Sequence, residues 1–360
     1  MTAPQRNKAH GLREHEGLWL RYRSNLPRHC IGVSRYLQSR LMHVLTDQLG
    51  HSRLRLNFEP YLVLVGERGA RPGELADQLA ISKQSCNQTI NQIEEAGYLA
   101  RTPDPQDGRA RVVMLTGQGR ELLRQGSELL GVIEAEFAGF IGAARLQQLI
   151  GMLAQLYRGL DLPAIKVPGN AAETGAALGG LLPRISDHMM QRLMELTRAK
   201  GHPGLKMSYA QVLSLIGPEG GRIQQMARIQ EVSKQAIAAV AKELETLGYI
   251  RRETDPEDAR QVLLILSERG LQLLADSVNS VTELERELQG IAGRRALGEI
   301  KNLVAELYRC LHLEEEIFGE VDMPAGLGLP GLASRLTQQL GPEGAAELAR
   351  LLAPQAEVVI

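Results

Sequence analysis

Cysteine, aromatic side chains and net charge are all scarce in this chain. Its 360 residues include three cysteines, one tryptophan and four phenylalanines, and the formal net charge is −1. Three cysteines far apart in sequence predict neither a disulfide framework nor a zinc knuckle, so we expect a protein of the reducing cytoplasm. A net charge near zero neither supports nor excludes nucleic-acid binding, because DNA responds to the local field of the surface that it contacts.

Long apolar runs and catalytic motifs are also missing. No stretch approaches the ~20 residues of a membrane-spanning helix, and Met1–Leu20 is too polar and charged for a signal peptide. The sequence holds no nucleophile elbow, phosphate-binding loop or pair of catalytic carboxylates, and its eight histidines show no metal-ligand spacing. We therefore expect no enzyme activity, no cofactor, no metal site and no membrane partner.

The chain does contain a long internal repeat. The stretch 97–119 returns as 248–270, and nine of the 23 aligned pairs are identical without any gap. Counterparts lie 151 positions apart, as Asp104 and Asp255 do. This spacing is far longer than the roughly 20–50 residues of a solenoid repeat and matches a whole domain. The sequence therefore predicts two copies of one fold in tandem.

Each copy predicts the same series of elements, from helical periodicity and turn residues. The expected helices are 28–49, 59–67, 72–80, 82–96, 119–137 and 145–160 in the first copy, and 183–199, 209–216, 222–230, 233–247, 270–288 and 294–312 in the second. The expected strands are 98–101 with 111–116, and 249–252 with 262–267. A helix–turn–helix followed by a β-hairpin is a winged helix. The predicted fold class is therefore mainly α with small β-wings, in two winged helix–turn–helix domains.

The repeat also sets the expected domain boundaries. Residues 1–160 form the first winged-helix repeat and residues 183–318 the second. Between them, 161–182 contains prolines and part of a Gly/Ala-rich run, which indicate a linker. The tail, 319–360, has no counterpart in the first copy, and its leucines at near-helical spacing predict one helix.

The second helix of each helix–turn–helix has a capping residue at both ends. Ser82 and Ser233 stand at the start, where a hydroxyl can cap a free backbone N–H. Gly97 and Gly248 follow the last turn, where a left-handed backbone is favoured.

Four short motifs recur in both copies. Ser-Lys-Gln opens the second helix, Gly-Tyr follows it, Asp-Pro-x-Asp-x-Arg comes next, and a strand then ends in Leu-(Thr/Ser)-x-x-Gly. This combination resembles the MarR family of bacterial transcription regulators, over about 28–160 and 183–313. Members are typically homodimers with interleaved terminal helices and one winged helix per subunit. For this chain the resemblance implies a monomer whose long helices form an intramolecular pseudo-dimer core.

The resemblance also implies a function. We expect a sequence-specific, nucleoid-associated repressor whose two winged helices straddle a pseudo-palindrome in double-stranded DNA, with recognition helices about one helical turn (~34 Å) apart. A small phenolic or otherwise apolar effector, bound in the cleft between helical core and winged helices, would release the DNA by favouring the incompetent geometry. The alternative is a winged-helix protein-interaction module with little or no specific DNA binding. The alanine-rich second recognition helix favours that alternative, whereas the Lys, Gln and Arg retained in both copies oppose it.

Helical spacing divides each recognition helix into a core face and an outer face. In the first copy Cys86, Ile90 and Ile93 should face the core. In the second copy the expected core residues are Ile237, Val240, Ala241 and Leu244. The residues expected at the DNA are Ser82, Lys83, Gln84, Asn87, Gln88 and Asn91 in the first copy, and Ser233, Lys234, Gln235, Ala238, Ala239 and Lys242 in the second.

These outer faces predict unequal half-sites. Asn and Gln can pair with adenine, and Lys can reach guanine or phosphate. Asn87 and Gln88 are replaced by Ala238 and Ala239, which can only touch thymine methyl groups. The first copy should therefore discriminate between sequences more strongly than the second. The alternative is that both outer faces are polar only because they are exposed to solvent, without contacting DNA.

The wings supply a second predicted contact. The wing residues assigned to DNA are Asp107, Arg109 and Arg111 in the first copy, and Asp258 and Arg260 in the second. In the MarR family the matching arginine typically enters the minor groove, where narrow A·T tracts attract cations. The carboxylate two residues earlier can orient it. The second wing has Val262 in place of Arg111, which predicts a weaker grip. The alternative is that each Asp–Arg pair only closes a turn.

Cys30 is the candidate for redox sensing. It lies early in the first helix, where thiol-sensing members of the family place a reactive cysteine, and Arg28 and His29 beside it could lower its pKa. Its counterpart in the second copy is Leu181, so a switch would be one-sided. A packed, inert cysteine is the reading that the sequence favours.

Overall fold

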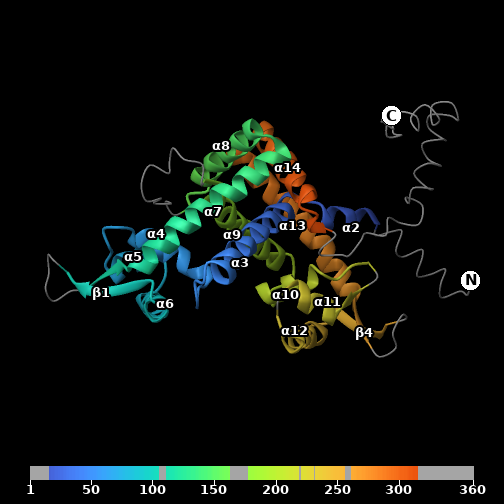
Figure 1. Cartoon of the computed structure of the whole chain (residues 1–360). Coiled ribbons are helices and arrows are strands. Elements are labelled where there is room, and N and C mark those ends of the chain that lie inside the picture. The colour runs from blue at the N-terminus through green and yellow to red at the C-terminus, as the bar shows by residue number, and fades with distance from the viewer. Residues whose placement is uncertain are drawn as a thin grey trace, which may run out of the picture. The chain divides into compact units, whose positions relative to one another are not determined.

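The two repeats fold into matching series of helices and small β-wings (Figure 1). The computed structural model describes residues 16–104, 111–162, 177–218, 220–230, 232–255 and 261–314. The structure is mainly helical with two small antiparallel sheets, which confirms the predicted fold class. No helix of the described residues is long and apolar enough to cross a membrane.

Each winged helix consists of three short helices and a hairpin. In the first copy these are α4 (Glu59–Val65), α5 (Pro72–Gln78), α6 (Lys83–Glu95), β1 (Leu99–Pro103) and β2 (Arg111–Leu115). In the second copy they are α10 (Met207–Leu213), α11 (Ile223–Ile229), α12 (Lys234–Thr246), β4 (Ile250–Thr254) and β5 (Val262–Leu266). The helices α5 and α11, and α6 and α12, correspond residue for residue at the repeat spacing. The two recognition helices can therefore be compared position by position.

The predicted capping residues lie at the ends of both recognition helices. The Ser82 hydroxyl accepts a hydrogen bond of 3.1 Å from the backbone N–H of Ser85, and Ser233 caps α12 in the same way. Gly97 and Gly248 have φ angles of 87° and 77°, in the left-handed region that favours glycine. The recognition helices therefore begin and end where local chemistry places them.

The hairpins form where the sequence predicts their strands, with one addition. Leu99 pairs with Leu115, and Ile250 pairs with Leu266. A short strand β3 (Gly221–Arg222) joins β5 and gives the second sheet the order β3-β5-β4. Its counterpart in the first copy is a single bridge between Ala70 and Val113. The sequence did not predict this third strand, because a strand of two residues is too short to show an alternation of apolar and polar side chains.

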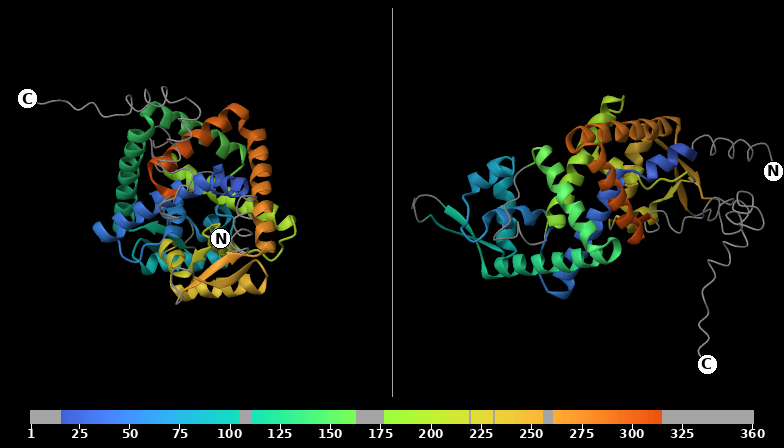
Figure 2. Two further views of the ribbon diagram at one scale, coloured as in Figure 1. Left: turned by 90° about the vertical axis from the view of Figure 1, so that its right-hand side faces the viewer. Right: turned by 90° about the horizontal axis from the view of Figure 1, so that it is seen from above.

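The long helices of both repeats pack together. They are α2 (Glu16–Arg23), α3 (Leu26–His43), α7 (Gly117–Ile141) and α8 (Ala143–Gly159) in the first copy, and α9 (Ala177–Ala199), α13 (Glu268–Ala292) and α14 (Arg294–Cys310) in the second. Figure 1 shows α7 running from the first wing to α8, and α13 from the second wing to α14. In the left view of Figure 2, α7 and α13 lie on either side of the central helices.

One hydrophobic cluster takes side chains from both copies. Val33 and Leu153 from the first copy and Ile185 and Leu303 from the second all belong to it, and each is almost fully buried. The guanidinium of Arg145 in α8 forms two hydrogen bonds, of 3.0 and 2.6 Å, with the carboxylate of Glu306 in α14. Burial of apolar surface across the two copies is thus the main force that holds the core together.

The first long helix of the second copy differs from expectation. Proline favours the first turn of a helix, so the sequence placed its start at Pro183. The observed α9 begins at Ala177 and continues through Pro183. A contact from another helix supports this first turn: Glu134 of α7 accepts a hydrogen bond of 2.9 Å from the backbone N–H of Leu178. That carboxyl satisfies a free N–H of the first turn, a contact that the local sequence does not reveal.

The N-terminal helices also differ from expectation. The helix expected over 28–49 is α-helical only over Leu26–His43. A π-helical turn, Val44–Gln48, follows it directly. The helix α2 was not predicted. The stretch 163–176 of the predicted linker and the tail 319–360 lie outside the described residues, so their boundaries stay predictions.

Candidate nucleic-acid interface

The outer face of α6 is polar and open to solvent. Cys86, Ile90 and Ile93 are fully buried against the first winged helix, as predicted. The six residues assigned to DNA are all exposed, namely Ser82, Lys83, Gln84, Asn87, Gln88 and Asn91. Their placement fits a recognition helix that presents its N-terminal half, although contact with bases stays a prediction.

The second recognition helix has the same geometry with smaller side chains. Ile237, Ala241 and Leu244 are buried, whereas Val240, which was expected in the core, is only half-buried. Ser233, Lys234, Gln235, Ala239 and Lys242 are exposed, and Ala238 is half-buried. The outer face of α12 therefore offers few groups that can read base edges.

An ion pair joins each recognition helix to its wing. Arg101 in β1 pairs with Glu94 in α6, and its Nη2 donates a bond of 3.4 Å to the Asn87 side chain. In the second copy the Nε of Arg252 lies 3.0 Å from the carboxylate of Glu245. The pair fixes the wing strand against the helix that should enter the groove. Identity of both residues at the repeat spacing was the signal that could have revealed it.

A second ion pair anchors the root of each wing. Asp104 and Asp255, the first aspartates of the Asp-Pro-x-Asp-x-Arg motif, keep only 7% and 1% of their surface exposed. The Nε of Arg71, just before α5, donates to Asp104 over 2.7 Å, and the Nε of Arg222 donates to Asp255 over 2.5 Å. A buried carboxylate is costly unless it is paired, so these aspartates hold the hairpin to the helix–turn–helix. The motif in the sequence indicated only a turn at these aspartates.

The tips of the wings are not part of the described structure. Asp107, Arg109, Asp258 and Arg260 lie outside the described residues, so their roles stay predictions. Arg111 begins β2 and is exposed.

Cys30 is wholly buried in the shared core. Burial raises the pKa of its thiol to about 12, so the suggestion that Arg28 and His29 lower it is wrong. Burial, and then the charge of Arg28, lower the pKa of His29 itself to about 4, which leaves its ring uncharged near neutral pH. Because only the thiolate is reactive, the geometry supports the packed alternative, with Leu181 in the equivalent place.

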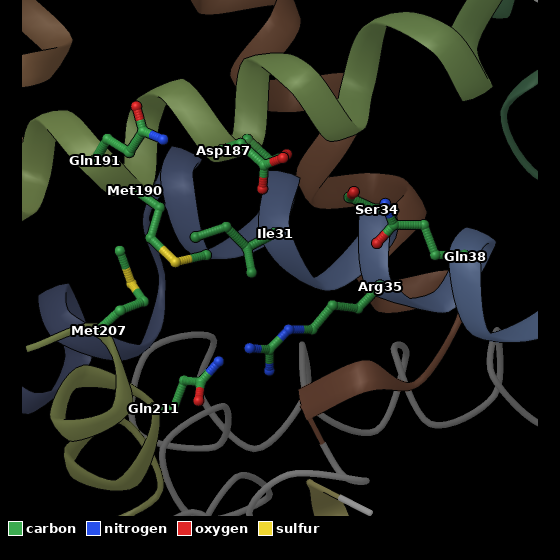
Figure 3. Close-up of a pocket in the computed structure, with 10 residues that line it drawn as sticks. Ile31, Ser34, Arg35, Gln38, Asp187, Met190, Gln191, Met207 and Gln211 are labelled. Atoms are coloured by element: carbon green, nitrogen blue, oxygen red, sulfur yellow. The ribbon is translucent and has the colours of Figure 1, made fainter. Parts of the chain in front are cut away.

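A cavity of about 310 Å³ lies between the helical core and the second winged helix. Figure 3 shows Arg35 of α3 and Asp187 of α9 pointing into it, with Met207 and Gln211 of α10 on the far side. The nearby protein displaces water, which raises the pKa of Asp187 and lowers that of Arg35. Neither side chain forms an ion pair with another described residue.

The same cavity contains an unsatisfied hydroxyl. Ser186 lines it with 2% of its surface exposed, and its Oγ has no hydrogen-bond partner among the residues that the structure describes. A buried polar atom without a partner costs about 1–3 kcal/mol, so this oxygen favours a ligand that can donate or accept there.

A model of the MarR family matches residues 60–110 and 204–261, one segment in each winged helix. Among solved structures, the chain is similar to a transcriptional regulator from Thermotoga maritima, with 19% identity over 37% of this chain and 92% of the other and a TM-score of 0.31. It is also similar to CouR from Rhodococcus jostii RHA1 bound to p-coumaroyl-CoA, with 24% identity over 32% and 92% and a TM-score of 0.26. A third similar structure is a MarR variant from E. coli complexed with operator DNA, with 17% identity over 36% and 92% and a TM-score of 0.30.

The family match therefore occurs twice, once in each repeat, and each matched segment includes a recognition helix and the first strand of a wing hairpin. The chain belongs to the MarR family of winged helix–turn–helix, DNA-binding transcription regulators.

Proposed function

We propose that this chain represses transcription by binding a pseudo-palindromic operator as a single-chain pseudo-dimer. The observation that carries the proposal is the hydrophobic cluster shared by both repeats, since it puts two winged helices on one folded body. In this mode α6 and α12 enter successive major grooves on one side of the duplex. The exposed polar face of α6 and the wing-root ion pairs in both copies support it.

The test is a footprint on the DNA upstream of its own gene, measured across a salt series. We expect protection with imperfect two-fold symmetry, a complex mass of one chain per site, and a steep salt slope. Arg109→Ala should weaken binding if the wing arginine enters the minor groove. Weak binding without sequence preference, unchanged by that substitution, would instead favour the protein-interaction module.

The two half-sites should contribute unequally to specificity. Asn87 and Gln88 offer amides that can pair with adenine, whereas Ala238 and Ala239 offer only methyl groups. In the free protein Asn87 donates a bond of 2.9 Å to the Lys83 carbonyl, and it must exchange this bond to read a base. Each half-site is mutated in turn and binding is measured at fixed salt. Equal penalties in the two half-sites would contradict the prediction.

We also infer that an effector binds in the cavity between α3, α9 and α10. Its mixed lining of Arg35, Asp187, Ser186 and methionines fits a small phenolic molecule better than a purely apolar one. Because α10 belongs to the second winged helix, a ligand that bridges α9 and α10 would shift that winged helix relative to the core. Release of DNA requires that the ligand bind this shifted arrangement more tightly.

Calorimetry with phenol, a hydroxybenzoate and toluene tests the inference. We expect the hydroxybenzoate to bind most tightly and to weaken operator binding, and Arg35→Gln to reduce its affinity about tenfold through loss of a charge-assisted hydrogen bond. Ser186→Val removes the unsatisfied hydroxyl and serves as the second probe. Equal binding of all three compounds, unaffected by either substitution, would show that the cavity is not the effector site.

A further inference from the structure

The two winged helices differ in charge as well as in base-reading groups. Residues 71–96 contain two cationic and four acidic side chains, whereas the matched residues 222–247 contain four cationic and three acidic ones. The difference concentrates in the first helix of each helix–turn–helix. Asp77 in α5 is exposed, and its counterpart in α11 is Arg228, which is exposed as well. One position of the DNA-facing motif thus carries opposite charges in the two halves.

A neighbouring position also becomes less negative in the second copy. Glu74 of α5 is matched by Gln225 of α11, so a second negative charge is absent from the second copy. In the first copy the Glu74 carboxylate accepts a bond of 3.2 Å from the backbone N–H of Arg71 and caps the start of α5. Glu74 therefore caps α5 itself, while α11 has no acidic residue in its first turn.

In the second copy these residues line an open groove of about 820 Å³. The groove runs between α11, the start of α12 and the root of the wing, and it is lined by Arg222, Gln225, Arg228, Ser233, Lys234 and Gln235. Arg222 is engaged by Asp255, as described above. Arg228 and Lys234 form no ion pair with any residue within the described ranges.

The chemistry of this groove fits a backbone phosphate. Arg228, Lys234 and the side-chain amides are hydrogen-bond donors, and the positive end of α12 favours an anion beside its first turn. At the equivalent place on the first copy, Asp77 would repel the same phosphate. The amide-rich face of α6 lies next to an acidic helix, and the alanine-rich face of α12 lies next to a cationic groove.

We propose that the two halves divide the work of DNA binding: the groove of the second winged helix grips backbone phosphates and supplies affinity, while the first winged helix reads bases and supplies specificity. This inference rests on the proposed DNA-binding function. It means that the second winged helix, although poorer in base-reading groups, holds the DNA through the positive charges of α11 and of the start of α12.

The test measures the salt slope of binding to the operator and to a scrambled duplex of equal length. Arg228→Gln removes one phosphate contact, so the slope should fall by about 0.9 and the affinity for both duplexes by about tenfold. Asp77→Arg places the same cation on the first copy, so the slope should rise by a similar amount. The variant with Asn87→Ala should lose affinity for the operator alone.

The outcomes separate the two proposals. If the wild-type protein binds neither duplex with a salt-dependent affinity, the proposed function fails. If it binds the operator but Arg228→Gln leaves both the slope and the scrambled-duplex affinity unchanged, the division of labour is wrong and the DNA-binding function stands. Circular dichroism of each variant verifies the fold, and since Asp77 and Arg228 are both exposed, neither substitution disturbs a packed core.

Discussion

The carboxyl group of Glu134 joins the two repeats, and its ionisation should be visible in the stability of the whole core. Glu134 keeps 6% of its surface exposed and accepts a bond of 2.9 Å from the backbone N–H of Leu178. Burial raises its pKa from 4.5 to about 7, while the bonds from Leu178 and Gly179 oppose the rise. Near neutral pH, the folded protein therefore carries this group partly protonated.

The sign and size of the effect follow from that difference. Between pH 4.5 and about 7 the folded state holds the proton more tightly than the unfolded chain, so the stability contributed by Glu134 falls as pH rises. The difference in pKa corresponds to about 3 kcal/mol. Glu134→Gln keeps the acceptor but cannot ionise. We expect this variant to match the wild type near pH 4.5 and to exceed its free energy of unfolding by about 3 kcal/mol at pH 8.

Urea unfolding followed by circular dichroism, at several pH values for both proteins, measures the difference directly. The comparison is needed because His29 acts in the opposite direction: its pKa is lowered to about 4, so its contribution is lost as pH falls below 6.5. That contribution cancels between variant and wild type. The matched control is Glu285→Gln, whose carboxylate lies 2.7 Å from the Lys301 ammonium in a partly exposed pair and should cost no more than about 1 kcal/mol. A difference for Glu134→Gln that does not change with pH would refute the reasoning.

Three further outcomes follow from the geometry. Gly119→Ala should destabilise the protein by about 1–3 kcal/mol, because a Cβ there would overlap the Tyr98 carbonyl oxygen, whereas Gly117→Ala in the same turn meets nothing within 4 Å and should be neutral or better; thermal melts compare the two. Asp255→Ala leaves Arg222 without its buried partner and should cost about 3 kcal/mol in urea unfolding, and an unchanged midpoint would show that the wing root does not need the pair. A thiol reagent should label Cys30 only after denaturation. If Cys30 in the native protein reacts as fast as a solvent-exposed thiol, its burial is contradicted.

Local signals in the sequence were sufficient for the winged helices. Ser82 and Gly97 mark the ends of α6 because capping depends on residues next to each other in the chain. The burial of Cys86, Ile90 and Ile93 follows from helical spacing alone. These features are decided within a few residues, so a single sequence contains them.

Features that depend on distant residues were missed. Glu134 lies 44 positions before Leu178 and accepts a hydrogen bond from the first turn of α9, and helix propensity cannot report such a contact. Asp104 pairs with Arg71 across 33 positions, so the motif was read as a turn when it is also an anchor. The direction of the Cys30 pKa was wrong because neighbouring charges are visible in a sequence, while the depth of burial is not.

The shared core of the two repeats has a genetic consequence. In a homodimer every substitution appears in both subunits, so a change that suits one half-site is imposed on the other. Here each half of the core and each winged helix has its own codons, and a substitution such as Asp77 against Arg228 alters one side only. The association of the halves is also intramolecular and does not depend on how many copies a cell contains. Under the proposed function, such a chain can follow an operator whose two arms change in sequence independently, one arm at a time.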